Sequence, residues 1–547
     1  MASFDQPLLG QPKRSIPLCR ALLFTLSVVS LLSLAALVAI HLASSNHFAV
    51  CANAKIPSSC LTLVSREVVS GILPMSQIQL LQILLKRSVS GVATATQVTH
   101  RLNLIPSNGF FIKQQAGLSD CLQLLDLSRD LLEDSSMALR SLSKRSHSDA
   151  HSWLSAVLTN YDTCLDGLQG TAKSMMKAQI QNLMALASTS LAIVNSFSPL
   201  DAEDQLLEPL NGEYPFWVTS RDRKLLESSA DAIQADVVVA KDGSGKYKTI
   251  QEAVDTAPDK SKTRYVIHVK KGTYKEQVQI QKKKKNIMLV GDGMDSTIIT
   301  GSLNVVDGST TFNSATIAAV GEGFMAQDLW IQNTAGPEKH QAVALRVGAD
   351  MSVINRCKID AYQDTLYTHS LRQFYRNCSI TGTVDFIFGN AAVVFQKCKI
   401  IARKPMDNQK NMITAQGRTD PNQNTGTSIQ NCDVIPSADL IPVKGKIKSY
   451  LGRPWKEFSR TVYMQSFIDN HIDPSGWSPW KGDFALKTLY YGEYSNRGPG
   501  AGTSKRVTWP GYHVITDPKE AKKFTVKELI QGDQWLPSTG VSYTEGL

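Results

Sequence analysis

The chain has 547 residues, which is too long for one ordinary hydrophobic core, so two or more domains are expected. Its 42% hydrophobic and 19% charged residues exclude a disordered protein. The net charge is +10, and most of the excess lies after residue 224, which indicates either a solvated basic surface or a polyanionic partner. No basic motif is interleaved with aromatic residues, so an acidic polysaccharide is at least as good a candidate as nucleic acid.

The N-terminal segment is apolar. Residues 21–43 carry no charge and follow Lys13, Arg14 and Arg20, which is typical of a segment that inserts into a membrane from a cytoplasmic N-terminus. The stretch is longer than most signal-peptide cores and has no convincing cleavage site. An uncleaved transmembrane signal anchor over 21–43, after a cytoplasmic tail of residues 1–20, is therefore favoured over a cleaved signal. The rest of the chain would then be translocated, where disulfides can form.

Residues 50 to 200 have the pattern of an all-α domain. Four apolar stripes at helical spacing, separated by short polar stretches, predict a four-helix bundle. None contains a catalytic or metal-binding constellation, so each is interpreted as core. The stripes are Ile78, Leu81, Leu85 and Val89; Leu118, Leu122, Leu125, Leu132 and Leu139; Trp153, Val157, Tyr161, Cys164 and Leu168; and Met176, Ile180, Leu183, Ala187 and Val194.

Four cysteines lie in this helical region. Cys51 and Cys60 could close a small loop, and Cys121 and Cys164 could tie two helices together. Four cysteines allow three pairings, and periodicity does not choose between them.

Residues 195 to 235 have the composition of a linker, with scattered prolines and acidic residues and no clear period. The segment contains a basic cluster followed by leucines, Arg221-Asp-Arg-Lys-Leu-Leu226. Alone, such a cluster is usually an exposed charged loop. Its place at a domain boundary favours a processing site for a secretory-pathway protease.

From Val237 onward, short apolar runs broken by Gly, Asp and Asn predict an all-β domain. A Cys-x-Ile repeat begins at Cys357, Cys378 and Cys398, with spacings of 21 and 20 residues. Such a period favours a stacked parallel β-helix over a sandwich. Stacking would bring either Cys357 and Cys378 or Cys378 and Cys398 within disulfide distance.

Two aspartates occupy the same place in this repeat. Asp364 lies seven residues after Cys357, and Asp385 lies seven after Cys378. They should therefore lie on successive coils, about 4.8 Å apart. Two carboxylates that close do not both ionise freely, so one should keep its proton while the other stays an anion. This predicts an acid paired with a nucleophile or base.

Five motifs in the C-terminal half resemble the pectin methylesterase (pectinesterase) family, in the family's order and over some 180 residues. The helical region, with Thr159-Asn-Tyr-Asp-Thr-Cys164, is similar to the plant invertase and pectin methylesterase inhibitor family. The resemblance implies a right-handed parallel β-helix over about 236–540 and a plant pectinesterase precursor overall. The five motifs are Gly272-Thr-Tyr-Lys-Glu276, Gln341-Ala-Val-Ala-Leu345, Gln363-Asp-Thr-Leu366, Gly382-Thr-Val-Asp-Phe-Ile-Phe-Gly389 and Leu451-Gly-Arg-Pro-Trp455.

The resemblance implies a role for each catalytic position. Asp385 would be the nucleophile that attacks the methyl ester of a galacturonate unit, and Asp364 the proton donor and then acceptor. Gln363 and Gln341 would stabilise the oxyanion of the tetrahedral intermediate. Each residue alone has a plainer interpretation, as a turn former or a surface side chain. Together, in family order, they favour the catalytic one.

The resemblance also implies the remaining site residues. Arg453 would hold Asp385 ionised and oriented, Trp455 would offer a flat face to a sugar ring, and Thr311 would contact substrate, as would Gln341. No cofactor and no metal is implied, and no ligand spacing indicates one. The disulfides implied by the resemblance are Cys51–Cys60, Cys121–Cys164 and Cys378–Cys398.

The sequence thus predicts a single-pass membrane precursor whose mature enzyme lies in the plant cell wall. The expected partners are pectin, a subtilisin-like processing protease and pectinesterase inhibitors, with no nucleic acid. The alternatives are a glycoside hydrolase with paired aspartates, or a protein that acts mainly as an inhibitor or wall-binding module. The sequon at Asn377 leaves glycosylation open. The predicted divisions are a tail at 1–20, an anchor at 21–43, an inhibitor-like bundle at 48–198, a linker at 199–235 with processing near Arg223–Leu226, and a catalytic β-helix at 236–540.

Overall fold

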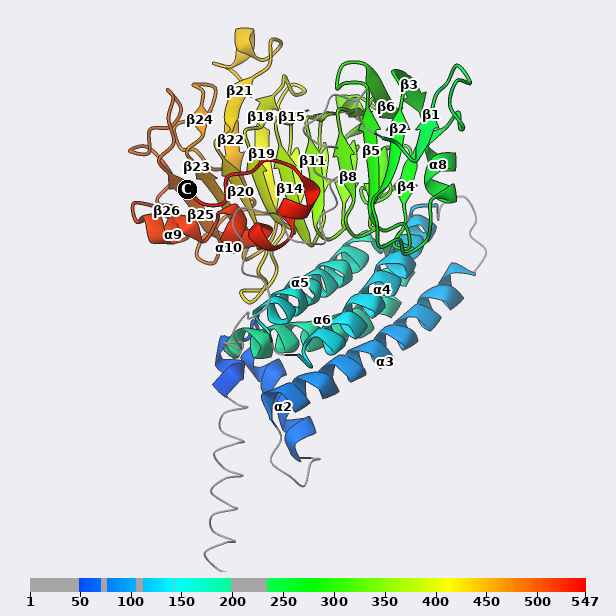
Figure 1. Ribbon diagram of the computed structural model, residues 1–547. Coiled ribbons are helices and arrows are strands. Elements are labelled where there is room, and N and C mark those ends of the chain that lie inside the picture. Colours follow the sequence, from blue (N-terminus) through cyan, green and yellow to red (C-terminus); the bar gives the residue numbers. More distant parts are fainter. Residues whose placement is uncertain (1–48, 70–75, 105–111, 142, 198–233) are drawn as a thin grey trace, which may run out of the picture.

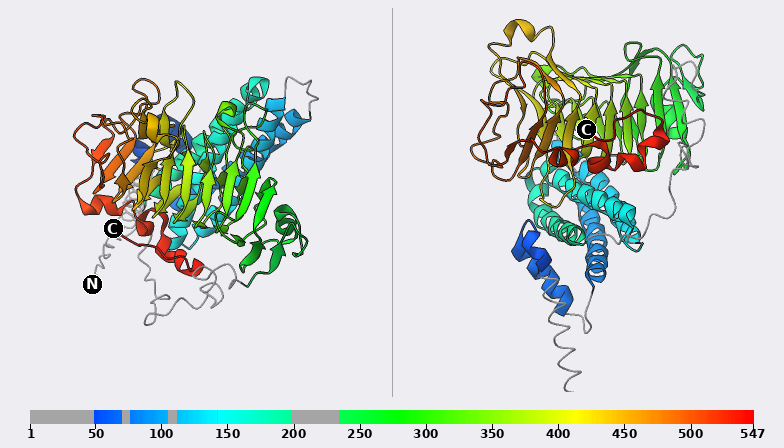
Figure 2. Two further views of the ribbon diagram at one scale, coloured as in Figure 1. Left: turned by 90° about the horizontal axis from the view of Figure 1, so that it is seen from above. Right: turned by 60° about the vertical axis from the view of Figure 1, so that its left-hand side comes forward.

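A computed structural model of the chain describes residues 49–69, 76–104, 112–141, 143–197 and 234–547. A bundle of helices is followed in the sequence by a long β-helix, and the bundle lies along one flank of that β-helix (Figures 1 and 2). The motif Arg221–Leu226, interpreted as a processing site, lies outside the described residues.

The helical part consists of amphipathic helices that close a shared core. Helix α3 contacts α4 and α6, and α5 contacts the same two, which is the neighbour pattern of a four-helix bundle. A capping box formed by Ser76 and Gln79 starts α3, and Ser143 caps α5. The helices are α2 (Pro57–Val69), α3 (Gln77–Asn103), α4 (Ile112–Ala138), α5 (Lys144–Gly167) and α6 (Gly170–Ser196), preceded by the 3-10 helix η1 (Cys51–Asn53).

Two parts of the expected fold were wrong. Among the residues that the structure describes, the helical part has five α-helices rather than four, because α2 forms ahead of the first predicted stripe and packs on α3 and α6. In addition, no helix within the described ranges is long and apolar enough to cross a membrane, so the expected anchor helix is unsupported. The segment 21–43, to which that expectation applied, is not among the described residues.

The β-helix is built from three parallel sheets, and along most of the chain every third strand belongs to the same sheet. Ile359 pairs with Ile380, and Ile380 with Ile400, so the Cys-x-Ile repeat does mark successive coils. The seven-stranded sheet is β4 (Val278–Ile280), β7 (Ile317–Ala319), β10 (Leu345–Val347), β13 (Leu366–Thr368), β16 (Ile387–Gly389), β19 (Asn411–Gln416) and β22 (Ser449–Gly452). The eight-stranded sheet is β3 (Gly272–Lys275), β6 (Thr297–Gly301), β9 (Trp330–Asn333), β12 (Lys358–Asp360), β15 (Ser379–Gly382), β18 (Lys399–Ala402), β21 (Asp433–Pro436) and β24 (Phe467–Ile468).

The third sheet runs the length of the β-helix, and short helices decorate the domain. The eleven-stranded sheet is β1 (Val237–Val239), β2 (Tyr265–Val269), β5 (Ile287–Gly291), β8 (Met325–Gln327), β11 (Ser352–Asn355), β14 (Arg372–Arg376), β17 (Ala392–Gln396), β20 (Gly426–Gln430), β23 (Arg460–Met464), β25 (Tyr490–Tyr494) and β26 (Tyr512–Val514). The helices are α8 (Ile250–Thr256), α9 (Pro518–Lys522) and α10 (Val526–Ile530), with 3-10 turns η4 (Pro337–Lys339), η5 (Ile441–Val443), η6 (Gly532–Gln534) and η7 (Leu536–Thr539).

The three sheets differ in what covers their outer faces. Many strands of the eight-stranded sheet alternate between buried and partly exposed residues, as in β15, so this face meets solvent. The central strands of the other two sheets are buried on both faces. The C-terminal segment around α10 packs on the eleven-stranded sheet, and the helical bundle packs on the seven-stranded sheet (Figures 1 and 2).

The cysteines divide into bridged and free groups. Cys51–Cys60 and Cys121–Cys164 are disulfides, which tie η1 to α2 and α4 to α5. The expected Cys378–Cys398 bridge is absent, since both are buried thiols, as are Cys357 and Cys432. Parallel stacking repeats one side-chain orientation on each coil, and the Cys378 thiol donates to the carbonyl of Ile354 at 3.3 Å. Burial raises the pKa of the Cys378 and Cys398 thiols well above the usual value.

Candidate active site

The two predicted aspartates lie just before paired strands on neighbouring coils. Leu366 of β13 pairs with Ile387 of β16, so Asp364 and Asp385 occupy equivalent positions, as the repeat predicted. The Asp364 amide donates to the carbonyl of Val384 at 3.0 Å, which fixes the spacing of these coils. Both aspartates have left-handed backbones, with φ of 64° and 51°. Such conformations are strained for non-glycine residues and cluster at functional sites.

The environments of the two carboxylates differ. Arg453 clamps Asp385 with two hydrogen bonds, from Nε to Oδ1 at 2.7 Å and from Nη2 to Oδ2 at 2.6 Å. Burial raises the pKa of Asp385, and these bonds oppose the rise. Asp364 has no such clamp, and burial together with the charge of Asp385 raises its pKa well above the usual value. Asp364 therefore holds its proton to higher pH, while Asp385 is held as an anion.

Two glutamine side chains lie beside this pair. Gln341 and Gln363 form a parallel bridge between neighbouring coils and line the same cavity as Asp364 and Asp385. Neither side-chain amide makes a hydrogen bond to any other described residue, so both can donate to a ligand. Thr311 lines this cavity as well. The structure thus brings together all the predicted catalytic residues.

An aromatic floor extends from the aspartates, and only Trp455 of this floor was predicted from the sequence. Tyr367 stacks on Phe388 with ring centroids 4.1 Å apart, and the Phe388 ring meets that of Trp455 edge-on at 6.0 Å. Phe312 and Trp480 also line the cavity. A signal was present in the motifs, since Tyr367 and Phe388 each lie three residues after one of the paired aspartates. Flat apolar surfaces of this kind suit sugar rings.

The cavity, of about 340 Å³, is walled by both parts of the chain. Its floor is the seven-stranded sheet, and its roof includes Asp120 of α4 and Thr163 and Asp166 of α5. No sequence signal marked these roof residues, because an apolar stripe shows which face of a helix is core and not what covers the other face.

Polar contacts fasten α5 to the rim of the cavity. Lys456, next to Trp455, forms ion pairs with Asp162 at 2.9 Å and Asp166 at 2.6 Å. Thr163 Oγ1 lies 3.0 Å from Nε2 of His369, which directly follows β13. The helical part therefore reaches directly over the catalytic coils.

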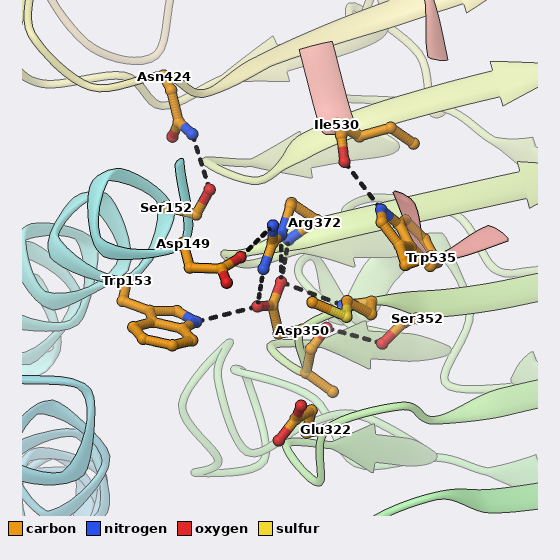
Figure 3. Close-up of polar contacts among 12 residues, drawn as sticks. Asp149, Ser152, Trp153, Glu322, Asp350, Ser352, Arg372, Asn424, Ile530 and Trp535 are labelled. Carbon is orange, nitrogen blue, oxygen red and sulfur yellow. Dashed lines mark hydrogen bonds and ion pairs between the residues drawn. The ribbon is translucent and has the colours of Figure 1, made fainter. Parts of the chain in front are cut away.

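A buried ion cluster anchors the same helix at β14, a strand of the eleven-stranded sheet (Figure 3). Arg372, at the start of β14, donates to Asp350 from Nε at 3.0 Å and from Nη2 at 2.7 Å. Asp149 of α5 pairs with Arg372 at 2.7 Å, and Trp153 of α5 donates to Asp350 at 3.0 Å. These carboxylates raise the pKa of Arg372 despite its burial. Helix α5 thus completes a charge cluster that belongs mainly to the β-helix.

Comparisons with known proteins agree with this architecture. Residues 236–533 match the Pectinesterase family, and residues 47–193 match the plant invertase/pectin methylesterase inhibitor family. "Pectinesterase 2.1" of Solanum lycopersicum is 59% identical over 502 residues, covering 92% of this chain and 91% of that protein. "Pectinesterase/pectinesterase inhibitor 18" of Arabidopsis thaliana is 54% identical over 567 residues, covering 100% of both.

The β-helix also has a solved counterpart. The structure of a pectin methylesterase from carrot is 63% identical, covers 58% of this chain and 99% of its own, and superposes with a TM-score of 0.57. The paired aspartates therefore lie in a scaffold shared with an established group of enzymes, and the chain belongs to the pectinesterase family, with an N-terminal domain of the plant invertase/pectin methylesterase inhibitor family.

Proposed function

We propose that this pectinesterase, a carboxylic ester hydrolase, removes methyl esters from pectin with Asp385 as its nucleophile. A carboxylate oxygen of Asp385 attacks the ester carbonyl and forms a tetrahedral intermediate. Asp364 gives its proton to the departing methanol, which leaves an anhydride between Asp385 and the galacturonate. Asp364, now an anion, accepts a proton from the water that cleaves this anhydride. This step restores both aspartates and releases the galacturonic acid, which then loses its proton to solvent.

The neighbouring residues have supporting roles in this proposal. The amides of Gln341 and Gln363 donate to the oxyanion of the intermediate, and a preorganised donor of this kind accelerates the reaction because it needs no reorganisation. Arg453 keeps Asp385 ionised and oriented for attack. Thr311 contacts the substrate, and Trp455 supports a sugar ring.

One observation carries the mechanism, namely the unequal environment of two equivalent aspartates. Only Asp385 is clamped by an arginine, so only Asp385 is an anion ready to attack. A glycoside hydrolase could also use paired carboxylates, but glycosidic cleavage creates no oxyanion for Gln341 and Gln363 to stabilise. Methanol release without new reducing ends distinguishes the two reactions.

Substitution of Asp385 by Asn tests the assignment. The isosteric amide is not a nucleophile, so methanol release should fall by about a thousandfold or more while the unfolding midpoint stays close to that of the parent. Asp328→Asn is a matched control, because Asp328 also has a left-handed backbone and a bidentate arginine partner, Arg356, but lies outside the cavity. Substantial methanol release by Asp385→Asn would show that another residue attacks.

The helical domain acts as an inhibitor of its own enzyme in this proposal. Its helices α4 and α5 roof the cavity, so a pectin chain and the helical domain compete for one surface. The uncleaved chain should therefore release methanol at a small fraction of the rate seen after the helical domain is removed. Equal rates before and after removal would contradict the inhibitory role, and would leave a purely structural function for the domain.

Maturation then separates the two parts. We infer an inhibitor-like domain over 48–198, a linker over 199–235 and a catalytic domain over 236–540. A subtilisin-like protease of the secretory pathway would cleave near Arg223–Leu226, and the mature enzyme would act outside the cell, in the wall. Pectin is the substrate, and separate pectinesterase inhibitors are further partners of the exposed cleft.

A further inference from the structure

The sequence contains one Asn-x-Ser/Thr triplet, the acceptor sequence for N-linked glycans, at Asn377-Cys378-Ser379. An asparagine in a tight turn is often only a turn former. A glycan also needs an asparagine that the folded chain leaves exposed, because the attached sugars are bulky and lie at the surface. The surroundings of Asn377 distinguish these two roles.

Asn377 lies at the turn between β14 and β15, where the chain passes from the eleven-stranded to the eight-stranded sheet. On successive coils, one residue at this turn has a left-handed backbone, with φ between 49° and 55°. Asparagine tolerates that conformation better than most residues do, but lysine and glutamine occupy equivalent positions. The turn alone therefore does not require asparagine. The residues at this position are Asp328, Arg356, Asn377, Lys397, Asn431 and Gln465.

The side chain of Asn377 is exposed and makes no hydrogen bond to any other described residue. Only its backbone N–H takes part in the coil, donating to the carbonyl of Gln396 at 3.2 Å, as any residue other than proline could do. Asp328, at the equivalent position two coils earlier, instead uses its side chain to accept two hydrogen bonds from Arg356. The amide nitrogen of Asn377 is therefore accessible to a modifying group.

The other two residues of the triplet lie on opposite sides of the backbone. Cys378 is buried in the core as a free thiol, so no disulfide crosses the acceptor triplet. Ser379 begins β15 and is partly exposed, on the same solvent-facing side as Asn377. Its neighbours in register, Lys358 and Lys399, are also at least partly exposed. The hydroxyl and the amide of the triplet thus share one open surface.

This turn lies away from the surfaces that the chain uses elsewhere. The helical bundle and the catalytic cavity lie over the seven-stranded sheet, and the C-terminal segment around α10 covers part of the eleven-stranded sheet. The eight-stranded sheet meets solvent and lies across the β-helix from the bundle (Figure 1). A glycan on Asn377 has room over that sheet both before and after the helical domain is removed.

We propose that Asn377 is an N-glycosylation site whose glycan covers the solvent-exposed face of the eight-stranded sheet around β15. The inference rests on the secretory location proposed above, which the disulfides Cys51–Cys60 and Cys121–Cys164 support. The donor is an oligosaccharide linked to a polyprenyl diphosphate. Nδ2 of Asn377 forms a bond to the anomeric carbon of the first sugar, and the bond from that carbon to the diphosphate breaks. The amide loses one proton to solvent as the lipid diphosphate leaves.

Peptide mass spectrometry of the full chain made in plant cells tests the site. Enzymatic release of the glycan in heavy-oxygen water should convert Asn377 to a labelled aspartate. Ser379→Ala removes the acceptor hydroxyl but keeps the left-handed asparagine, so this variant should lose the glycan. Asn431→Gln is the matched control, because Asn431 has the same backbone and also precedes a cysteine, but is followed at the third position by Asp433 instead of a hydroxyl residue. It should keep the glycan of the parent.

An unmodified Asn377 in a chain that carries both disulfides would overturn the proposal, as would a glycan that persists in Ser379→Ala. An unmodified Asn377 in a chain without the disulfides would overturn it together with the secretory location. If Ser379→Ala does not fold, the labelled aspartate in the parent still decides the result.

The placement of the glycan has its own test. In a chain cut within the linker, enzymatic removal of the glycan should leave kcat and KM for methanol release unchanged, because the glycan lies across the β-helix from the cleft. A changed KM would overturn this placement. None of these outcomes depends on which aspartate attacks the ester, so the esterase mechanism is tested separately.

Discussion

Among the individual residues, the glutamines are expected to determine which reaction the two paired aspartates perform. Gln363→Met keeps the length of the side chain but removes its N–H donors from the cavity. We expect kcat for methanol release to fall on the order of a hundredfold with little change in KM, because the lost hydrogen bond forms to an oxyanion that exists only in the transition state.

The control for this prediction is Gln277→Met. Gln277 is exposed, and its side-chain amide donates to the carbonyl of Ala315 outside the catalytic cavity. The control should keep both kinetic constants. A Gln363→Met enzyme with unchanged kcat and a raised KM would instead identify Gln363 as a residue that binds substrate and transition state equally.

Sequence reasoning found the site residues that the coil repeat places in register. Asp364 and Asp385 could be predicted because a 21-residue period puts them on neighbouring coils, and the register confirms it. Asp120, which roofs the cavity, could not be predicted as a residue of this site, because it lies on a helix of the other domain.

Among the secondary-structure elements, periodicity predicted which elements form better than it predicted how their side chains are oriented and what packs on their outer faces. The Cys-x-Ile repeat identified stacked coils, because parallel stacking repeats side chains above one another. The same repeat did not predict whether stacked thiols pair, since that depends on side-chain rotation, and Cys378 points its thiol at a carbonyl instead.

The apolar strands of the seven-stranded sheet carried a further signal. Strands such as β13 and β19 are buried on both faces, so something must cover the outside of that sheet. Local sequence does not say what covers it, because the covering helices lie some 200 residues earlier in the chain. The structure shows that the helical bundle supplies the cover, and the catalytic cleft lies under it.

For the molecule as a whole, the interface between the two domains contains groups that respond to pH. His151 of α5 lies at this interface, and its Nε2–H donates to the carbonyl of Asn422 at 2.6 Å. Burial lowers the pKa of His151 to about 4, against this bond, and the positive charges of His147, Arg460 and Arg418 lower it further. Asp120 has the opposite effect on domain association. Its pKa rises to about 6 in the interface, so its protonation at lower pH favours association.

The contribution of His151 to domain association should weaken as the pH falls. Its pKa in the interface is below the value of 6.5 that it has when exposed, so this contribution is complete above pH 6.5 and is lost as pH falls toward 4. In chains cut within the linker, the dissociation constant of the parent relative to His151→Gln should rise roughly twentyfold from pH 7 to pH 5. His100→Gln is the control, because His100 is exposed in the last turn of α3, away from His151, and should leave the pH dependence unchanged. An identical pH dependence in the parent and in His151→Gln would mean that protonation of His151 does not weaken domain association. The effect of Asp120, which makes association tighter at low pH, would then be the remaining one of the two.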